Sequence, residues 1–260
     1  MKNRTKLPGV FLGIVMAVMY LPILMVVIYS FNESKLTAIW SGFSLDWYRK
    51  LFQDEEIMEA LANSLILAVL SCLAASVIGT LGALGNSRLK FRFKGGIEYV
   101  ATLPIMIPEI ILGMVFLAFF GLFGLSGGML TLVIAHTAFC IPYIYMMVKA
   151  RLAGMDPALE EAARDLGATP VRTFFTVTLP MLLPAVASGG LLAFAMSFDD
   201  VIISIFVTGP KVTTLPVKIY TQMKTGVTPE INALCTVMLG VTILVLLLSG
   251  FLRKKARAAG

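Results

Sequence analysis

The sequence predicts an all-helical integral membrane domain with about six membrane-spanning helices. Its 260 residues are 58% hydrophobic and only 14% charged, whereas soluble domains average about 45–50% apolar and about 25% charged residues. The apolar residues occur in six long stretches, and most of the 21 Lys and Arg residues lie between these stretches. Because a lipid bilayer is the solvent that accepts so much apolar surface, we expect a single transmembrane domain over residues 1–260.

Each apolar stretch is long enough to form a spanning helix, which needs about 20 mainly apolar residues at a rise of about 1.5 Å per residue. The first stretch follows Lys2, Arg4 and Lys6 but is too long for a cleaved signal peptide, so we expect it to be retained. The expected spans cover residues 8–31, 61–85, 97–123, 129–149, 183–207 and 233–252.

The distribution of basic residues predicts the orientation of the spans, because cytoplasmic loops are enriched in Lys and Arg. Basic clusters precede the first span, separate the second from the third and the fourth from the fifth, and follow the sixth. This pattern places both termini in the cytoplasm. The first external loop is acidic, with Glu33, Asp46, Asp54, Glu55, Glu56 and Glu59.

The three cysteines have no predicted chemical role. Cys72, Cys140 and Cys235 lie singly in apolar stretches and indicate neither a disulfide framework nor a metal site.

The cytoplasmic connection over residues 150–182 is expected to form a helix–turn–helix outside the bilayer. Asp156 and Pro157 are typical of a helix start, and Gly167 is typical of a left-handed helix end. We therefore expect a short helix over residues 157–166. Thr169 and Pro170 repeat the start signal for a second helix, which Pro180 is expected to limit. Such a knob can transmit force from a soluble partner, although the same signals also suit a plain connecting loop.

The same connection carries a family motif. The motif of ABC importer permeases is EAA, three residues, Gly, nine residues, an aliphatic residue, one residue and then LP. The chain resembles this family at every fixed place, with Val177 at the aliphatic position, through Glu161, Ala162, Ala163, Gly167, Leu179 and Pro180. The resemblance implies that these residues couple the chain to a cytoplasmic ATPase. It also implies that the chain is not an enzyme and has no cofactor, since ATP and Mg bind to the ATPase.

Three acidic residues of the predicted spans are candidates for a functional role. Glu109 is in the third span, and Asp199 and Asp200 are toward the outer end of the fifth. A charged acid at the bilayer centre costs about 2.5–3.5 kcal/mol on insertion scales, so such residues usually face a bundle interior or a water-filled path. We expect these carboxylates to line a route for a cation. The alternative is an acid at a helix end, or one paired with a lysine.

The segments around these acids narrow the resemblance. SFDDVIISIFVTGP, LPVKIY, GVTPEINAL and SGFSLDWYRKLF resemble the PotC-type permeases of spermidine/putrescine importers over essentially the whole chain. This resemblance implies a substrate path for polyamines along Asp199, Asp200, Glu109, Ser197 and Trp47. Many members have Asp where this chain has Glu109, which keeps the charge but changes the reach of the side chain. The sequence does not show whether spermidine or putrescine is preferred, because that choice is expected to belong to the binding protein.

The resemblance also implies the surroundings of the chain. It predicts a multi-pass protein of the bacterial inner membrane that pairs with a second, related permease. Two copies of a cytoplasmic ATPase would bind below, and an extracytoplasmic polyamine-binding protein would dock outside. No nucleic acid is expected to bind, since the basic residues follow the pattern of a membrane topology signal.

Several alternatives remain at this stage. An ABC importer of another substrate, such as a metal ion or thiamine, shares the coupling motif, whereas the acids argue against an oxyanion. An autonomous secondary carrier would have no ATPase for the motif to bind, and no cluster suited to a membrane enzyme is present in the sequence.

Three further features of the sequence have an interpretation of their own. Trp40 and Trp47 suit interfacial anchoring as well as contact with an ammonium group or a binding protein. His136 is expected to make a helix–helix hydrogen bond, and the LSGG sequence at residues 125–128 is expected to be an external turn.

Overall fold

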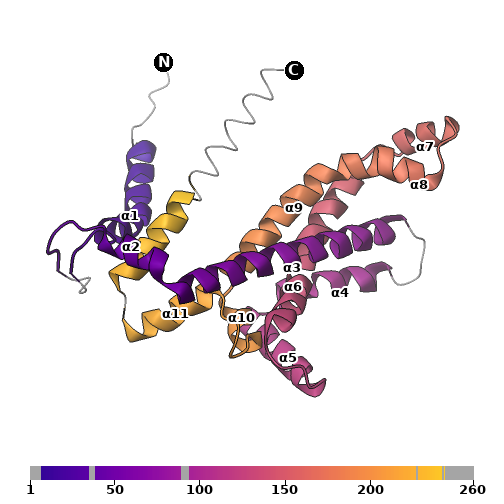
Figure 1. Cartoon of the computed structure of the whole chain (residues 1–260). Helices are drawn as coiled ribbons and strands as arrows, with labels where there is room; N and C mark the ends of the chain where they lie inside the picture. Colours follow the sequence, from indigo (N-terminus) through magenta and orange to yellow (C-terminus); the bar gives the residue numbers. More distant parts are fainter. Residues whose placement is uncertain (1–6, 35–38, 89–93, 227, 242, 244–260) are drawn as a thin grey trace, which may run out of the picture. The chain divides into compact units, whose positions relative to one another are not determined.

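The computed structural model describes residues 7–34, 39–88, 94–226, 228–241 and 243, and these are helical apart from short connections and two isolated β-bridges (Figure 1). The chain divides into two compact units. One comprises Met1–Met58 with Ile219–Gly260, and the other comprises Glu59–Lys218. Each unit is described by itself.

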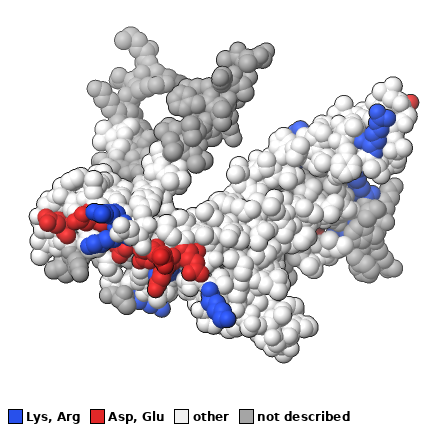
Figure 2. Space-filling view, in the orientation of Figure 1, with Lys and Arg blue, Asp and Glu red and all other residues white. Residues whose placement is uncertain are grey.

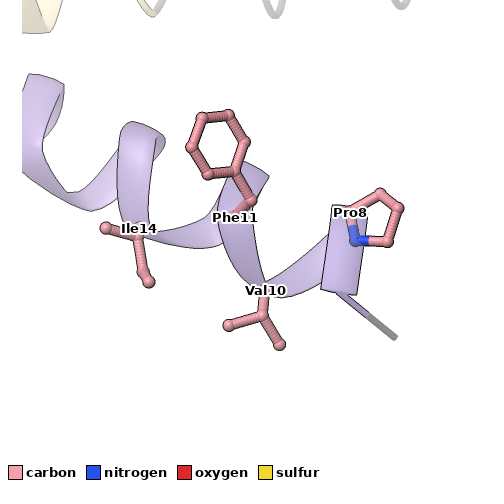
Figure 3. A pocket seen from close by; sticks show the side chains of 4 residues that line it. All are labelled: Pro8, Val10, Phe11 and Ile14. Carbon is pink, nitrogen blue, oxygen red and sulfur yellow. The ribbon is translucent and has the colours of Figure 1, made fainter. Parts of the chain in front are cut away.

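The first unit contains α1 (Leu7–Tyr29) and the amphipathic helix α2 (Asp46–Gln53). Helix α1 is apolar on all sides and exposes its side chains to the surroundings, as expected of a lipid-facing span. Near its start, Pro8, Val10, Phe11 and Ile14 line an open apolar depression (Figure 3). After α1, the buried Asn32 holds the following loop, because its Nδ2 donates to the Ile39 carbonyl at 2.8 Å and its Oδ1 accepts from the Ser41 amide at 3.0 Å.

The second unit is built around α6, whose side chains from His136 to Val148 supply much of its buried core. Small residues let the neighbouring helices approach closely. A Cβ on Gly189 of α9 would lie 3.1 Å from the Ile144 Cα, and one on Gly190 would lie 3.4 Å from the Cys72 Sγ of α3. Glycines at helix contacts are typical of membrane bundles. The helices of this unit are α3 (Glu55–Arg88), apart from its first turn, α4 (Lys94–Met106), α5 (Glu109–Leu122), α6 (Met129–Ala153), α7 (Ala158–Asp165), α8 (Pro170–Thr173), the π-helical turn η1 (Phe174–Thr178), α9 (Leu179–Asp199) and α10 (Ile202–Val207). Helix α11 (Leu215–Thr225) begins in this unit, and its residues from Ile219 onward belong to the first unit.

Four of the described helices are long and apolar enough to cross a membrane, and a bent pair provides a fifth candidate. The four are Pro8–Tyr29, Glu55–Arg88, Met129–Ala153 and Pro170–Asp199. The expected sixth span over residues 233–252 falls partly outside the described residues. Its described part belongs to a shorter apolar helix, Pro229–Val241. The chain is therefore a multi-pass membrane protein with an all-helical fold.

Two expected spans differ from the structure. The third, expected to run unbroken over residues 97–123, is split into α4 and α5, which bend by 109°. Pro108 adopts an extended ψ of 133° and is the N-cap residue of α5, because proline suits a helix start but interrupts a helix interior. The fifth, expected over residues 183–207, ends at Asp199, and Ile202 starts the separate helix α10.

Pro180 does not limit a helix, contrary to expectation. The helical run continues from Pro170 to Asp199 through η1, in which the Leu179 amide donates to the Phe174 carbonyl one residue beyond α-helical spacing. This wider turn precedes the proline directly. Because Pro180 has no amide hydrogen to donate, the turn is placed where the regular hydrogen-bond ladder has to be interrupted.

Two glycines allow a close crossing of two loops. A Cβ on Gly209 would overlap the Gly127 backbone, and a Cβ on Gly127 would overlap the Thr208 backbone. The nearby Thr131 hydroxyl donates to the Val207 carbonyl at 2.9 Å. The LSGG segment, residues 125–128, is thus a turn that packs by its backbone against residues 208–209.

Replacing Gly209 with Ala should destabilise the second unit by about 1–3 kcal/mol, which is typical of inserting a methyl group into a packed site. The two backbones would have to separate, which would weaken the contact between the two loops. Thermal unfolding in detergent measures the change. Gly128→Ala is the matched control, because a Cβ at Gly128 meets nothing within 4 Å. Equal unfolding temperatures for the two variants would contradict this role of Gly209.

Candidate functional site

The acidic residues predicted in the spans lie at two breaks between helices. Glu109 is the first residue of α5, directly after the bend that follows α4. Asp199 ends α9, and Asp200 adopts an extended ψ of 125° before α10 begins. The two short helices that follow these breaks pack together, and a Cβ on Gly113 of α5 would lie 2.6 Å from the Phe206 Cδ2 of α10. Broken helices at membrane depth occur where they are buried in protein or line a water-filled cavity.

Asp200 is turned into the second unit and caps α10. Its side chain is almost completely buried, and its Oδ1 accepts from the Ile203 amide at 3.2 Å. Its Oδ2 accepts from the Ser204 amide at 2.8 Å and from the Ser204 hydroxyl at 2.9 Å. These bonds satisfy orphan amides of the helix start. The arrangement corresponds to the helix-end alternative for this acid.

His136 and Ser197 complete the buried cluster around Asp200. The imidazole Nδ1 lies 2.8 Å from the Ser197 hydroxyl, and Nε2 lies 3.1 Å from the Ser204 hydroxyl and 3.5 Å from Asp200 Oδ2. Because the Ser204 hydroxyl donates its proton to Asp200, Nε2 is the donor to Ser204, and in the neutral ring Nδ1 accepts from Ser197. The predicted helix–helix hydrogen bond of His136 is confirmed, and it joins α6 to both α9 and α10.

Asp200→Asn should destabilise the protein by about 1–3 kcal/mol, the cost of leaving a buried donor unsatisfied. The amide that replaces Oδ1 or Oδ2 would present hydrogens to groups that are themselves donors, namely the amides of Ile203 and Ser204. Thermal unfolding of the purified protein reports the change. Asp199→Asn serves as the control, since Asp199 is exposed. The role of Asp200 as a cap would be rejected if both variants unfolded at the same temperature.

Of the three acids predicted to line a path, Asp199 and Glu109 remain accessible within the second unit. Asp199 is exposed at the end of α9, and Glu109 is half-buried at the start of α5. Glu109 lies close enough to the half-buried Tyr143 of α6 for the two side chains to interact electrostatically. The carboxyl ends of α4 and α9 precede these acids, and a helix end of this kind carries a partial negative charge. Both breaks are therefore suited to attract a cation.

Trp47 lies in the first unit and is buried. Its indole Nε1 donates to the Asn32 carbonyl at 2.8 Å, and the Lys50 amine lies 4.5 Å from the centre of its ring. Trp40 is half-exposed and makes an edge contact with Tyr29. The Trp47 ring thus already has an ammonium group of its own chain against it. Its place in a substrate path stays a prediction.

The coupling segment has the local structure that its sequence predicts. Helix α7 begins with the Ala158 amide donating to Asp156 Oδ1 at 3.0 Å, and it is followed by Gly167 with a φ of 84°. Thr169 caps the next helix by accepting from the Arg172 amide at 3.3 Å. The expected helix–turn–helix is confirmed over this segment.

The residues of the coupling motif leave much of this segment's surface open. Glu161, Ala162 and Gly167 are exposed, Ala163 and Leu179 are partly exposed, and Pro180 is exposed. The side chain of Leu166 is 90% exposed. Exposed apolar side chains grouped beside polar ones are typical of a protein contact surface. The basic Arg164 and Arg172 lie at the ends of α7 and α8, where Figure 2 shows blue side chains.

Sequence reasoning missed one residue of this segment. Glu160, the neighbour of the motif glutamate, forms an ion pair with Arg88 at the end of α3 and accepts from the Thr178 hydroxyl at 2.7 Å. The only signal available in the sequence was the position of an acid in the first turn of a helix, which also suits a solvent-exposed residue.

Residues 75–255 match the family described as binding-protein-dependent transport system inner membrane component. A putrescine transport system permease protein, PotI, of Escherichia coli (strain K12) is 43% identical over 245 residues, which are 92% of this chain and 87% of PotI. A spermidine/putrescine transport system permease protein, PotC, of Haemophilus influenzae is 38% identical over 253 residues, which are 97% of this chain and 98% of PotC.

Solved structures share the fold at lower identity. A bacterial ABC transporter involved in the import of the acidic polysaccharide alginate matches with a TM-score of 0.73 and 15% identity, covering 98% of both chains. The MetNI methionine ABC transporter, in an inward-facing conformation, matches with a TM-score of 0.63 and 21% identity, covering 78% of this chain and 98% of that chain. At these identities the matches show the fold, which is that of ABC importer permeases.

Proposed function

The chain belongs to the family of binding-protein-dependent transport system inner membrane components, and from this premise we propose that it is the permease subunit of an ATP-driven importer of polyamines. The observation that supports the substrate is the pair of accessible acids, Asp199 and Glu109, at two helix breaks. Polyamines are multivalent cations, so carboxylates in the path replace part of their lost hydration. Relatives named as putrescine and spermidine/putrescine permeases support the same substrate class.

The proposed arrangement in the bilayer has six spans, with both termini in the cytoplasm of a bacterial cell and the spans in its inner membrane. The distribution of Lys and Arg supports this orientation. Acidic side chains gather over α2 and the first turns of α3 (Figure 2), on the side that would face away from the cytoplasm. In this orientation the coupling segment from α7 to η1 is cytoplasmic.

The proposed partners follow from the coupling segment and the family. A second, related permease would supply the other half of the path, and two cytoplasmic ATPase subunits would bind the exposed surface that includes Glu161, Ala162 and Gly167. A polyamine-loaded binding protein would dock on the opposite side. ATP and Mg would bind to the ATPase, so this chain would carry no cofactor and catalyse no reaction. Leu179 and Pro180 would join the coupling segment to α9.

Within this chain the proposed path runs along Asp199 and Glu109. Asp200 and Ser197 would act indirectly, because they fix the break between α9 and α10 from the buried side. A permease for a metal ion or thiamine is the alternative of the same class. An autonomous secondary carrier would transport without any ATPase.

Reconstitution tests the proposal. The chain, its partner permease and the ATPase are placed in proteoliposomes with ATP enclosed, and radiolabelled spermidine or putrescine is supplied outside with the binding protein. We expect uptake that requires ATP. Uptake without the ATPase would indicate a secondary carrier, and ATP-dependent uptake of thiamine or a metal ion but not of polyamines would reject the substrate.

A further inference from the structure

Glu160 of α7 contacts side chains from two other elements of the second unit, α3 and η1. Its Oε1 forms an ion pair with an amino group of Arg88, the last residue of α3, and accepts from the Thr178 hydroxyl at 2.7 Å. The same amino group of Arg88 lies 3.2 Å from the Thr178 Oγ1. The short helix α7 is thereby tied to the end of α3 and to the last residue of the π-helical turn η1.

This cluster differs from an ordinary surface ion pair. The Thr178 side chain is fully buried and that of Glu160 is 19% exposed, while Arg88, at 38%, is the one exposed member. By comparison, the ion pair between Lys149 of α6 and Glu98 of α4 has exposures of 40% and 43%, in the range where such pairs contribute little. The charges of the cluster also suit the helix ends, since Arg88 lies at the carboxyl end of α3 and Glu160 in the first turn of α7.

The cluster lies directly beside the coupling motif, because Glu160 precedes the motif residue Glu161. Glu161 is exposed, whereas its neighbour Glu160 is turned toward the body of the unit. Helix α7 otherwise packs on α8 and η1, which lead directly into α9. Without Glu160, α7 would still be connected to α9 through α8 and η1, but its ion pair with Arg88 of α3 would be lost.

We propose that Arg88, Glu160 and Thr178 form a clamp that positions α7, so that movement of α7 by the ATPase is passed to α3 as well as to α9. This inference rests on the proposed function as an ATP-driven permease. The three are positioning residues and do not contact the substrate. The π-helical turn η1 contributes Thr178 to the clamp, consistent with the frequent occurrence of such turns at functional sites.

The test uses the full reconstituted complex and measures two rates, ATP hydrolysis stimulated by the loaded binding protein and uptake of radiolabelled spermidine. Their ratio reports the coupling. Thr178→Val removes the hydroxyl with little change of shape, and Thr178→Ser retains it. Arg88→Glu and Glu160→Arg reverse the charges singly, and the double variant restores an opposite pair. Glu98→Gln, in the ion pair with Lys149, is the matched control.

We expect Thr178→Val and both single charge reversals to lower the amount of spermidine transported per ATP by about tenfold, within the range of coupling energies in polar networks. Thr178→Ser, Glu98→Gln and the double reversal should retain most of the ratio. An unchanged ratio in the three impaired variants would overturn the clamp, as would loss of the assembled complex with Thr178→Val, which would show a folding role. Failure of the unmodified complex to take up spermidine would instead count against the proposed function.

Discussion

Replacing Asp199 with Asn should lower ATP-dependent spermidine uptake by about 30-fold, while the complex still assembles. Removing one partner of a desolvated charge pair typically costs about 2–5 kcal/mol, and the lower end of that range corresponds to about 30-fold. Asp199 is exposed at the end of α9, so its loss leaves the buried cluster of Asp200 and His136 intact. The measurement is the initial rate of radiolabelled uptake into proteoliposomes.

The controls for Asp199 separate charge from structure. Asp199→Glu keeps the charge and should retain a large part of the uptake. Glu55→Gln removes an exposed acid at the start of α3 and should leave the rate unchanged. Full uptake by Asp199→Asn in a correctly assembled complex would show that this carboxylate takes no part in the passage of the cation.

Reversing the charge of Glu161 should reduce uptake by about a hundredfold, the largest effect that we expect. Glu161 is exposed on α7 near the open side chain of Leu166, and placing like charges together in an interface costs several kcal/mol. In Glu161→Lys, the ATPase should bind weakly, so hydrolysis stimulated by the loaded binding protein falls together with uptake. Co-purification of the ATPase and both rates measure the effect.

A second variant tests the same segment through its backbone. Gly167 has a φ of 84°, which proline cannot adopt, so Gly167→Pro should also uncouple the complex. Gly154→Ala is the control in the same connection, because the nearest atom to its Cβ would be 3.7 Å away. Normal uptake by Glu161→Lys and by Gly167→Pro would show that α7 is not where the ATPase acts.

The helix ends of the coupling segment were predictable because their signals are local. Asp156, Thr169 and Gly167 act on backbone groups within a few residues of themselves, so the sequence contains all the partners involved. The apolar stretches were equally visible, since the length of a span depends only on the thickness of the bilayer.

The sequence did not predict where the helices break, or which acidic side chains are buried and which are exposed. The hydrophobicity of a stretch does not show whether its helix axis changes direction. Residues 97–123 remain mainly apolar through the 109° bend between α4 and α5. Asp199 and Asp200 are neighbours with the same chemistry, yet one is exposed and the other is buried. That difference depends on His136 and Ser204, and a contact such as Arg88 with Glu160 joins residues 72 positions apart.

If the ATPase moves the coupling segment as proposed, the continuous helical run from Pro170 to Asp199 would act as a lever. Its 30 residues span about 45 Å at the α-helical rise of about 1.5 Å per residue. A rigid tilt of about 10° around its midpoint would displace each end by about 4 Å, given that length. A modest push at Pro170 would therefore be sufficient to shift the carboxylate of Asp199 by more than the length of a hydrogen bond, without melting a single turn.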